Sequence, residues 1–343
     1  MVVELKVADE SDAQRWDELV ARSPHGTIFH NWQFLKTVEK YSGTKLYPIM
    51  GLVKDEVEAL LPIYSGKKSI FRMASSPPPW MAVPYLGPLI IGYGSTHQHE
   101  VEKYYYGFQE KVDEFLEKEV KPHYTVIATP PGLEDVRPYT WNGYTPTPLY
   151  NYITDLSQDE ADIWKGIKKK TRQNITKTQR EGLVMELGGL DEVGKIYESV
   201  NDRYREQGRT QPVPLDYIED IYREYKDNLF VYTARKDGEY VSGHVDVCYK
   251  DKVSSWVGSA KVSMKGVYPN DMLAWEAKKH AKEEGYRYYE VIGANTPRLS
   301  PYKNKYNPRP ELNFQVKKCS SAMVSVAEGS YKIMNSILGK VKK

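Results

Sequence analysis

Several common features of protein sequences are scarce in this chain of 343 residues, and each scarcity argues against a class of protein. There are two cysteines, Cys248 and Cys319, and neither belongs to a Cys-x-x-Cys pair or a His/Cys cluster. A disulfide framework and a zinc site are therefore disfavoured. No apolar run approaches the roughly 20 residues of a membrane-spanning helix. Residues 1–12 lack a basic-then-apolar signal pattern, so the expected location is the cytoplasm.

Net charge is also nearly absent. The formal charge is +2, so a polyanionic partner would have to be recognised by a local patch and not by the field of the whole molecule. Hydrophobic residues make up 40% and charged residues 27% of the chain, as in soluble globular proteins. The length suits two domains of ordinary size.

Periodic patterns predict an ordered set of elements in the first half of the chain. Apolar residues at helical spacing indicate helices, and runs of β-branched and aromatic residues bounded by turn residues indicate strands. In order, we expect a strand at 2–7, a helix carrying Trp16, Leu19 and Val20, a helix at 32–41, a hairpin of strands 47–53 and 57–63, a stiff loop at 75–79, a strand at 85–91, a helix at about 97–119 and a strand at 124–128. Residues 130–150, rich in Pro, Gly and Tyr, are interpreted as the crossover between domains.

The second half repeats this order. The expected elements are a basic helix at about 163–181, a strand at 183–187, helices at 190–206 and 215–225, strands at 229–235, 240–249 and 253–257, a helix at 272–284 and a short strand that ends at Gly293. Both halves thus read strand, helix, helix, hairpin, strand, helix, strand, and an internal duplication explains this economically.

A loop with two aromatics and two lysines follows the last of these strands. Its end reads Tyr302-Lys303-Asn304-Lys305-Tyr306. Loops at the C-terminal ends of strands often carry the chemistry of α/β proteins. Lysines held against aromatic rings could steady a phosphate or a developing oxyanion. The alternative is an exposed basic loop whose tyrosines pack on the body.

The basic helix is the clearest local positive patch. Its cationic residues are Lys165, Lys168, Lys169, Lys170, Arg172, Lys177 and Arg180. Arg172 could bind a phosphate with two hydrogen bonds, and Lys169 could add charge. A nucleotide diphosphate, a lipid diphosphate or tRNA would suit such a patch, and a solvated helix face is the alternative.

The chain resembles the FemAB-like family, whose members carry two GNAT-type domains. The stretches that carry the resemblance, over about residues 12–306, are Gly26-Thr27-Ile28-Phe29-His30-Asn31-Trp32 with Lys36, Ala59-Leu60-Leu61-Pro62, Tyr85-Leu86-Gly87-Pro88-Leu89, Lys169-Lys170-Thr171-Arg172-Gln173-Asn174-Ile175 with Lys177 and Gly182, Tyr268-Pro269-Asn270, and Tyr302-Lys303-Asn304-Lys305-Tyr306. The last of these looks like the family's F-K-x-K-F element, and the basic stretch looks like its K-x-R-x-x-I-x-K element.

This resemblance implies an α/β fold of two tandem GNAT-type domains, each a mixed twisted sheet flanked by helices. The expected boundaries are 1–150, 151–320 with the basic helix at its entry, and 321–343. In the last segment Tyr331, Met334, Leu338 and Val341 at helical spacing, with lysines nearby, predict an amphipathic helix that could touch anionic lipid, although docking on the second domain is the favoured use. The implied activity is transfer of an aminoacyl or other acyl group to an amine of a peptide, sugar-nucleotide or lipid-linked acceptor. The best-known branch of the family takes amino acids from aminoacyl-tRNA, and no separate cofactor or metal is expected.

The resemblance also assigns roles to individual residues. It places Lys303 near the reacting carbonyl as the oxyanion donor, supported by Tyr302. The implied substrate and phosphate contacts are Arg172, Lys169, Lys36, Lys305, Tyr306 and Tyr85. Candidate proton acceptors, chosen from the residues themselves, are His244, Asp246 and Asp271.

Two other functions stay open. Acetyltransferases of this fold hold the coenzyme A pyrophosphate in a glycine-rich loop at a helix N-terminus. The corresponding segment, 259–270, has one glycine, Gly266, and no R/Q-x-x-G-x-G/A run, which disfavours standard acetyl-CoA binding. The chain also departs from the cell-wall branch, because Ile91, Gly92 and Tyr93 stand where an acidic residue often follows the Gly-Pro strand. The second alternative is a non-catalytic binding protein on the same fold.

Overall fold

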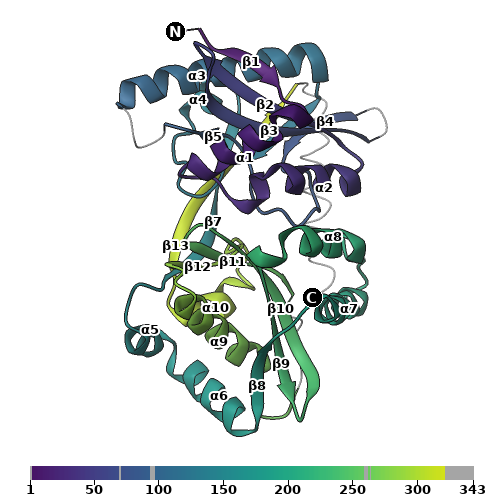
Figure 1. Ribbon diagram of the computed structural model, residues 1–343, viewed down its shortest axis with the longest axis vertical. Coiled ribbons are helices and arrows are strands. Elements are labelled where there is room, and N and C mark those ends of the chain that lie inside the picture. Colours follow the sequence, from purple (N-terminus) through teal and green to yellow (C-terminus); the bar gives the residue numbers. More distant parts are fainter. Residues whose placement is uncertain (1, 69–70, 93–96, 259–261, 263, 321–343) are drawn as a thin grey trace.

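One long mixed sheet organises the molecule. The computed structural model describes residues 2–68, 71–92, 97–258, 262 and 264–320. Within these residues the strand order is β1-β2-β3-β4-β6-β13-β7-β12-β11-β10-β9-β8, and the short strand β5 pairs with β3. Figure 1 shows this sheet running through both ends of the molecule, with helices on its faces.

We call the part of the chain from β1 to β7 the first half. Its strands are β1 (Glu4–Val7), β2 (Lys45–Val53), β3 (Glu56–Lys68), β4 (Phe71–Ser76), β5 (Leu89–Ile90), β6 (Tyr124–Ala128) and β7 (Thr145–Asp155). Its helices are α1 (Ala13–Arg22), α2 (Trp32–Ser42), α3 (Gln98–Phe115) and α4 (Arg137–Trp141). The predicted helices and hairpin are confirmed. The strand expected at 85–91 is reduced to β5, and β4 extends into the expected loop at 75–79.

The second half runs from α5 to β13. Its strands are β8 (Leu183–Leu187), β9 (Leu229–Lys236), β10 (Glu239–Tyr249), β11 (Lys252–Gly258), β12 (Tyr288–Val291) and β13 (Arg309–Cys319). Its helices are α5 (Glu160–Gly166), α6 (Lys169–Arg180), α7 (Leu190–Glu206), α8 (Leu215–Tyr225), α9 (Pro269–Glu283) and α10 (Ser300–Lys303). The prediction of one basic helix at 163–181 is wrong. The backbone is not helical at Ile167 and Lys168, where ψ is 136° and 129°, so two separate helices form. The side chain of Ile167 is buried in the core at this break.

The two halves exchange their last strands. Each half contains one parallel pair of strands, β4 with β6 and β11 with β12. Strands β6 and β12 lie next to the centre of the sheet. There β13 of the second half pairs with β6 of the first, and β7 of the first half pairs with β12 of the second. Strands β7 and β13 pair with each other from Thr145↔Lys317 to Ile153↔Arg309. Each half therefore completes the sheet of the other, and residues 145–150 of the segment interpreted as the crossover between domains form part of strand β7.

Buried side chains form three clusters within the described residues. One joins the halves, because α2 packs against α8, and this cluster includes Trp16, Leu35, Ile196 and Ile218. The backbone N–H of Phe34 donates to the Tyr225 hydroxyl across this contact, at 2.9 Å. Burying each such large apolar side chain stabilises the fold by about 1.5–3 kcal/mol.

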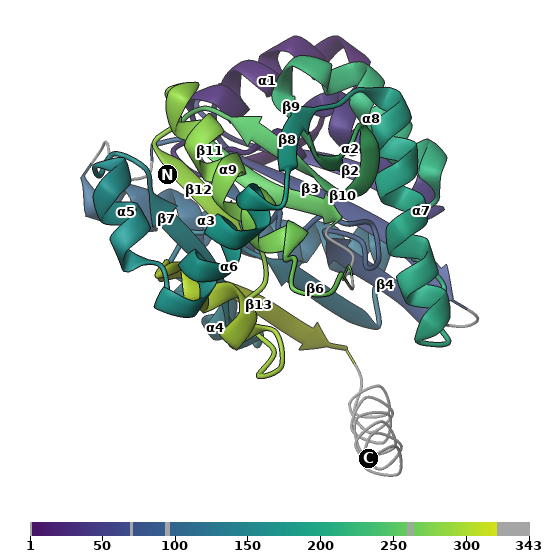
Figure 2. The same ribbon diagram turned by 90° about the horizontal axis from the view of Figure 1, so that it is seen from below.

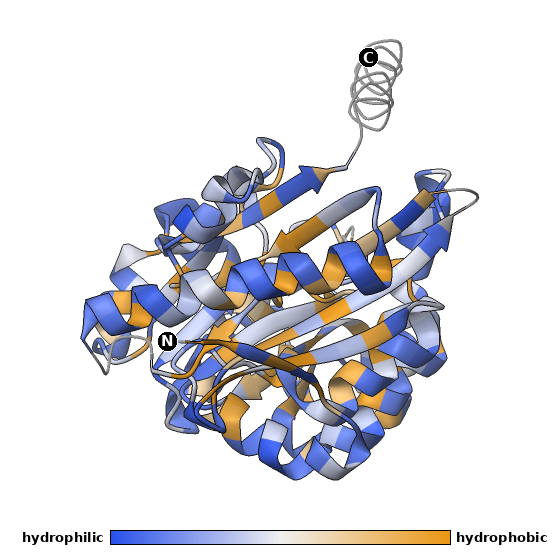
Figure 3. Ribbon diagram, turned by 90° about the horizontal axis from the view of Figure 1, so that it is seen from above, coloured by the Kyte–Doolittle hydropathy of each residue, from blue (hydrophilic) through white to orange (hydrophobic). Residues whose placement is uncertain are grey.

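The other two clusters lie on the far side of each half of the sheet. In the first half, α3 turns a buried stripe at helical spacing toward the sheet, which includes Tyr105, Phe108 and Val112. In the second half, α9 covers the sheet, and α6 packs beside it. Figure 2 shows α9 and α6 next to each other, and Figure 3 shows hydrophilic residues along the outer sides of the helices. The predicted helix at 321–343 lies outside the described residues.

Candidate active site at the end of strand β12

The amine of Lys303 is held at the C-terminal end of β12. This lysine ends the short helix α10, and its Nζ donates hydrogen bonds to the backbone carbonyls of Ile292 and, at 2.7 Å, Gly293. A lysine ammonium has three N–H donors, so one remains for another acceptor. The side chain is half buried, and burial lowers its pKa. Within the described parts of the chain, no carboxylate forms an ion pair with it.

Lys305 has the same charge in a different environment. Its Nζ lies 2.5 Å from the Oδ1 of Asp271 in the first turn of α9, and both side chains are largely buried. Asp271 also accepts a hydrogen bond from Asn174 of α6 at 3.2 Å. The rings of Tyr302 and Tyr306 lie 3.8 and 5.3 Å from the Lys305 Nζ, measured to the ring centroids. The charge of Lys305 is thus neutralised by Asp271, and two tyrosine rings lie beside its ammonium. Through Asp271 and Asn174, this contact connects the segment after α10 with α9 and α6.

A third lysine, which the sequence analysis missed, lies under these two. Lys278 of α9 is 2% exposed, and its Nζ lies 4.4 Å from the ring centroid of Tyr289 and 4.7 Å from that of Tyr306. Burial lowers the pKa of Lys278 to about 8. The available signal was its position three residues after Trp275 and three before Ala281, on the buried stripe of the helix.

A second buried carboxylate, that of Asp246 on β10, acts electrostatically on Lys278. It is fully buried and accepts a hydrogen bond of 2.5 Å from the Tyr289 hydroxyl. Its other oxygen lies 3.5 Å from the Nε2 of His244, which is also buried. The alternation of β10 thus brings the predicted proton acceptors His244 and Asp246 to the same face, under α9.

The predicted phosphate contacts on α6 lie beside this cluster. Arg172 is partly buried and donates from Nε to the carbonyl of Ile167 at 3.1 Å, while Lys169 is exposed. Lys177 lies against the segment that precedes α9, so close that a Cβ atom at Gly266 would be 2.5 Å from its Nζ. None of these three cations forms an ion pair with a carboxylate of the described chain. They leave a positive face along α6, next to the first turn of α9.

Lys36 is not brought to this cluster. It lies on α2 and pairs with Glu39 at 2.5 Å and Glu10 at 3.8 Å. The residues that line the hollow beside it all belong to the first half. In Figure 1, α2 lies in the upper part of the molecule and α10 in the lower part.

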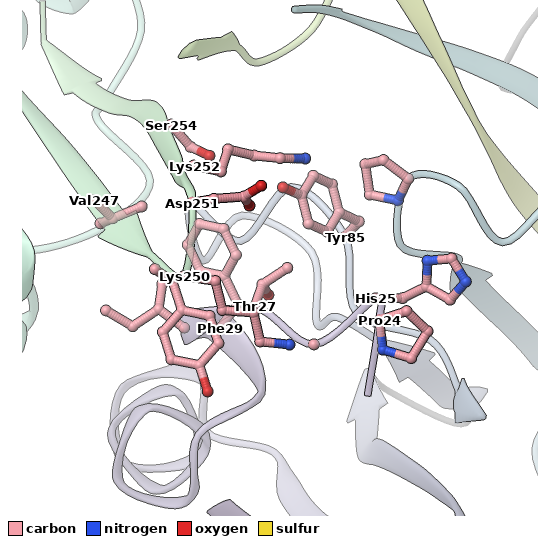
Figure 4. Close-up of a pocket in the computed structure, with 14 residues that line it drawn as sticks. Pro24, His25, Thr27, Phe29, Tyr85, Val247, Lys250, Asp251, Lys252 and Ser254 are labelled. Atoms are coloured by element: carbon pink, nitrogen blue, oxygen red, sulfur yellow. The ribbon is translucent and has the colours of Figure 1, made fainter. Parts of the chain in front are cut away.

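Tyr85 lies at the junction of the halves. Its ring is buried, and its hydroxyl donates to the Oε2 of Glu290 on β12 at 2.8 Å. It lines a pocket between the two halves, whose other walls include Thr27 of the first half and Lys252 and Ser254 of the second (Figure 4). Tyr85 and Lys303 are therefore on different elements, but both lie next to strand β12.

Comparison with known proteins supports the fold on which this site is built. A family model described as an acetyltransferase (GNAT) domain matches residues 167–304, which include α6, α9 and Lys303. No curated protein matches the chain in sequence. A structure titled "Crystal structure of FemX" superposes with a TM-score of 0.70 at 12% identity, over 91% of this chain and 96% of that one.

Two further structures extend this comparison. The structure of L-PGS from Bacillus licheniformis gives a TM-score of 0.56 at 15% identity, over 93% of this chain and 96% of the other. A tandem GNAT protein from the clavulanic acid biosynthesis pathway gives 0.52 at 11% identity, over 93% and 99%. The fold is therefore the tandem GNAT fold that FemX shares, and the expected resemblance is confirmed at that level. None of the helices in the described ranges is long and apolar enough to cross a membrane.

Proposed function

We propose that this protein is an acyltransferase that moves an aminoacyl or other acyl group onto an amine of a peptide, sugar-nucleotide or lipid-linked acceptor. The observation that carries the proposal is the third N–H of Lys303. Two backbone carbonyls fix the ammonium at the end of a central strand, and no carboxylate neutralises it within the described residues. The tandem GNAT fold supports acyl transfer as the reaction class.

A hydrogen-bond donor to the developing oxyanion usually makes the largest single contribution to the rate of such a reaction. The amine nitrogen attacks the carbonyl carbon of an ester or thioester, and the carbonyl oxygen becomes negatively charged. Lys303 donates its remaining N–H to this oxygen. When the tetrahedral intermediate collapses, the leaving oxygen or sulfur departs with its bonding electrons and takes the proton that the nitrogen gives up. Removing such a donor typically costs about 2.7–4 kcal/mol of barrier.

The neighbouring cations have two different roles in this proposal. Lys305 is already neutralised by Asp271, so with Tyr302 it shapes the loop that carries Lys303. Arg172 and Lys169, on the positive face of α6, contact phosphate of the donor or the acceptor. Charge of this kind suits the backbone of an aminoacyl-tRNA, whose binding would weaken as salt is raised.

The test combines donor binding with transfer. Purified protein is mixed with tRNA charged with labelled amino acids, and separately with labelled acetyl-CoA, at low and moderate salt, with a mixture of acceptor amines. Lys303→Ala should retain donor binding and lose transfer by about 10²–10³. Arg172→Ala should weaken tRNA binding and reduce its dependence on salt. Lys103→Ala on α3 and Arg223→Ala on α8, both exposed cations of the same type, serve as matched controls.

Other outcomes would replace the proposal. Transfer by Lys303→Ala at the wild-type rate would show that Lys303 is not the oxyanion donor. Tight binding of acetyl-CoA without binding of tRNA would make the protein an N-acetyltransferase. Ligand binding that Lys303→Ala leaves intact, with no transfer by the wild type from either donor, would point to a binding protein.

A further inference from the structure

We propose that Asn151 and Glu290 are positioning residues for Lys303, and that Tyr85 extends their hydrogen-bond network to the pocket between the two halves. This inference rests on the proposed function, because Lys303 is the residue to which that function assigns the oxyanion. It adds a role for the exchanged strand β7, on which Asn151 lies.

The first step concerns a single peptide group, the one between Ile292 and Gly293. Its carbonyl oxygen accepts a hydrogen bond from the Nζ of Lys303. Its N–H donates to the Oδ1 of Asn151 at 2.8 Å. A trans peptide is planar, with its N–H and C=O pointing in opposite directions. The hydrogen bond from this N–H to Asn151 therefore fixes the orientation of the peptide group, and with it the position of the carbonyl oxygen that accepts from Lys303.

The second step concerns the amide of Asn151, which is 4% exposed. While its oxygen accepts from Gly293, its Nδ2 donates to the Oε1 of Glu290 at 2.9 Å. Both ends of the amide are thus engaged, and the side chain has one orientation. The neighbouring residue Tyr150 also holds the loop, because its carbonyl accepts a hydrogen bond from the N–H of Ala294 at 2.7 Å.

The third step leads from Glu290 to the first half. Glu290 is fully buried on β12, and its Oε2 accepts from the hydroxyls of Tyr85 at 2.8 Å and Ser254 at 2.6 Å. Hydrogen bonds to a buried carboxylate are strong and directional, so three of them fix the side chain. Tyr85 and Ser254 also line the pocket shown in Figure 4. A continuous set of hydrogen bonds therefore runs from that pocket to the amine of Lys303.

The experiment measures Lys303 directly and needs no substrate. The whole protein is labelled with acetic anhydride in competition with a free amine between pH 7 and 11, and the labelling of each lysine is quantified by mass spectrometry. This gives the pKa of Lys303, with Lys305 as an internal reference. In Asn151→Ala the pKa of Lys303 should rise toward that of an exposed lysine, because the loop no longer holds the amine out of water. Lys305, held by Asp271, should not change.

The other variants separate positioning from general stability. Glu290→Gln keeps an oxygen for Asn151 and should leave Lys303 as in the wild type, while Glu290→Ala should behave like Asn151→Ala. Tyr85→Phe removes one hydroxyl, keeps the ring and should shift Lys303 in the same direction by less. Asn313→Ala is the matched control, because Asn313 is equally buried on β13 but donates to the carbonyl of Thr129 at 3.1 Å, outside the network.

Two results would overturn the inference. One is an Asn151→Ala variant in which the pKa of Lys303 equals that of the wild type, although the variant loses as much free energy of unfolding as Asn313→Ala. If Asn151→Ala does not fold, an unchanged titration in both Glu290→Ala and Tyr85→Phe decides in the same way. Once a donor is known, Asn151→Ala should lower kcat about 10- to 100-fold with KM changed less than about twofold.

Failure of the proposed function would look different. If Lys303→Ala transferred normally while Asn151→Ala still shifted the Lys303 titration, the network would stand and the assignment of the oxyanion would fall. The titration and the transfer rate therefore test the two proposals separately.

Discussion

The buried amine of Lys278 predicts that stability rises with pH above about pH 8. Its pKa falls from the ordinary value of 10.5 to about 8 because α9 and the sheet bury it. Between these two pH values the unfolded chain carries a proton on Lys278 that the folded chain does not, so raising the pH favours the folded state. At about 1.4 kcal/mol per pH unit, the full effect is roughly 3 kcal/mol.

The assay is urea unfolding of the wild type and Lys278→Met from pH 7 to 10.5. Subtracting the two free energies of unfolding removes the titration of the other groups, and methionine keeps an unbranched side chain of similar length without the charge. The difference, wild type minus variant, should be flat below about pH 7.5 and rise through pH 8–10. Lys279→Met, at the more exposed neighbouring position, controls for the substitution itself. A difference for Lys278→Met that stays flat or falls through this range would refute the reasoning.

Two further predictions concern the loop and the ion pair beside it. Asp271→Asn should destabilise the fold by about 3–5 kcal/mol in urea unfolding, because it leaves the buried charge of Lys305 unpaired. The control Asp162→Asn, which breaks an exposed ion pair, should cost at most about 1 kcal/mol. Equal losses of stability in the two variants would contradict this account. Gly293→Ala strains a backbone at φ +77° and places a methyl group 3.7 Å from the Lys303 Nζ, so it should cost about 1 kcal/mol and also reduce transfer. Gly285→Ala, at φ +85° with open space around it, should lose similar stability and keep transfer, and loss of transfer in both would contradict a local effect.

Local signals in the sequence were sufficient for most elements. Residues 190–206 and 215–225 carry a clear helical period, and their predicted bounds agree with α7 and α8. Strands β7 and β13 lack such a signal. Each contains proline, which is depleted in strands, and they are strands because they pair with each other at the centre of the sheet. Their partners lie far away in the sequence, so no local pattern reveals them.

The candidate site shows the same limit. The pattern of two lysines between tyrosines singled out this loop, but it made Lys303 and Lys305 look equivalent. They differ because the backbone turns one toward two carbonyls and the other toward Asp271, an aspartate on another helix. Asn151 gave no signal, since its role depends on a peptide group 142 positions away. The functional roles assigned to the site residues all stay predictions: these residues are Lys303, Tyr302, Arg172, Lys169, Lys36, Lys305, Tyr306 and Tyr85.

The exchange of β7 and β13 has a consequence for the time at which the protein can fold during its synthesis. The edge of β6 is complete only when β13 is made, and 191 residues separate the end of β6 at Ala128 from the end of β13 at Cys319. At about 5–20 residues per second, the ribosome needs roughly 10–40 s for this stretch. During that interval the first half has a central strand with a free edge, which is a site for pairing with other chains or for temporary pairing with β7. Among the strands of the described residues, the last to be synthesised therefore closes the first half of the sheet.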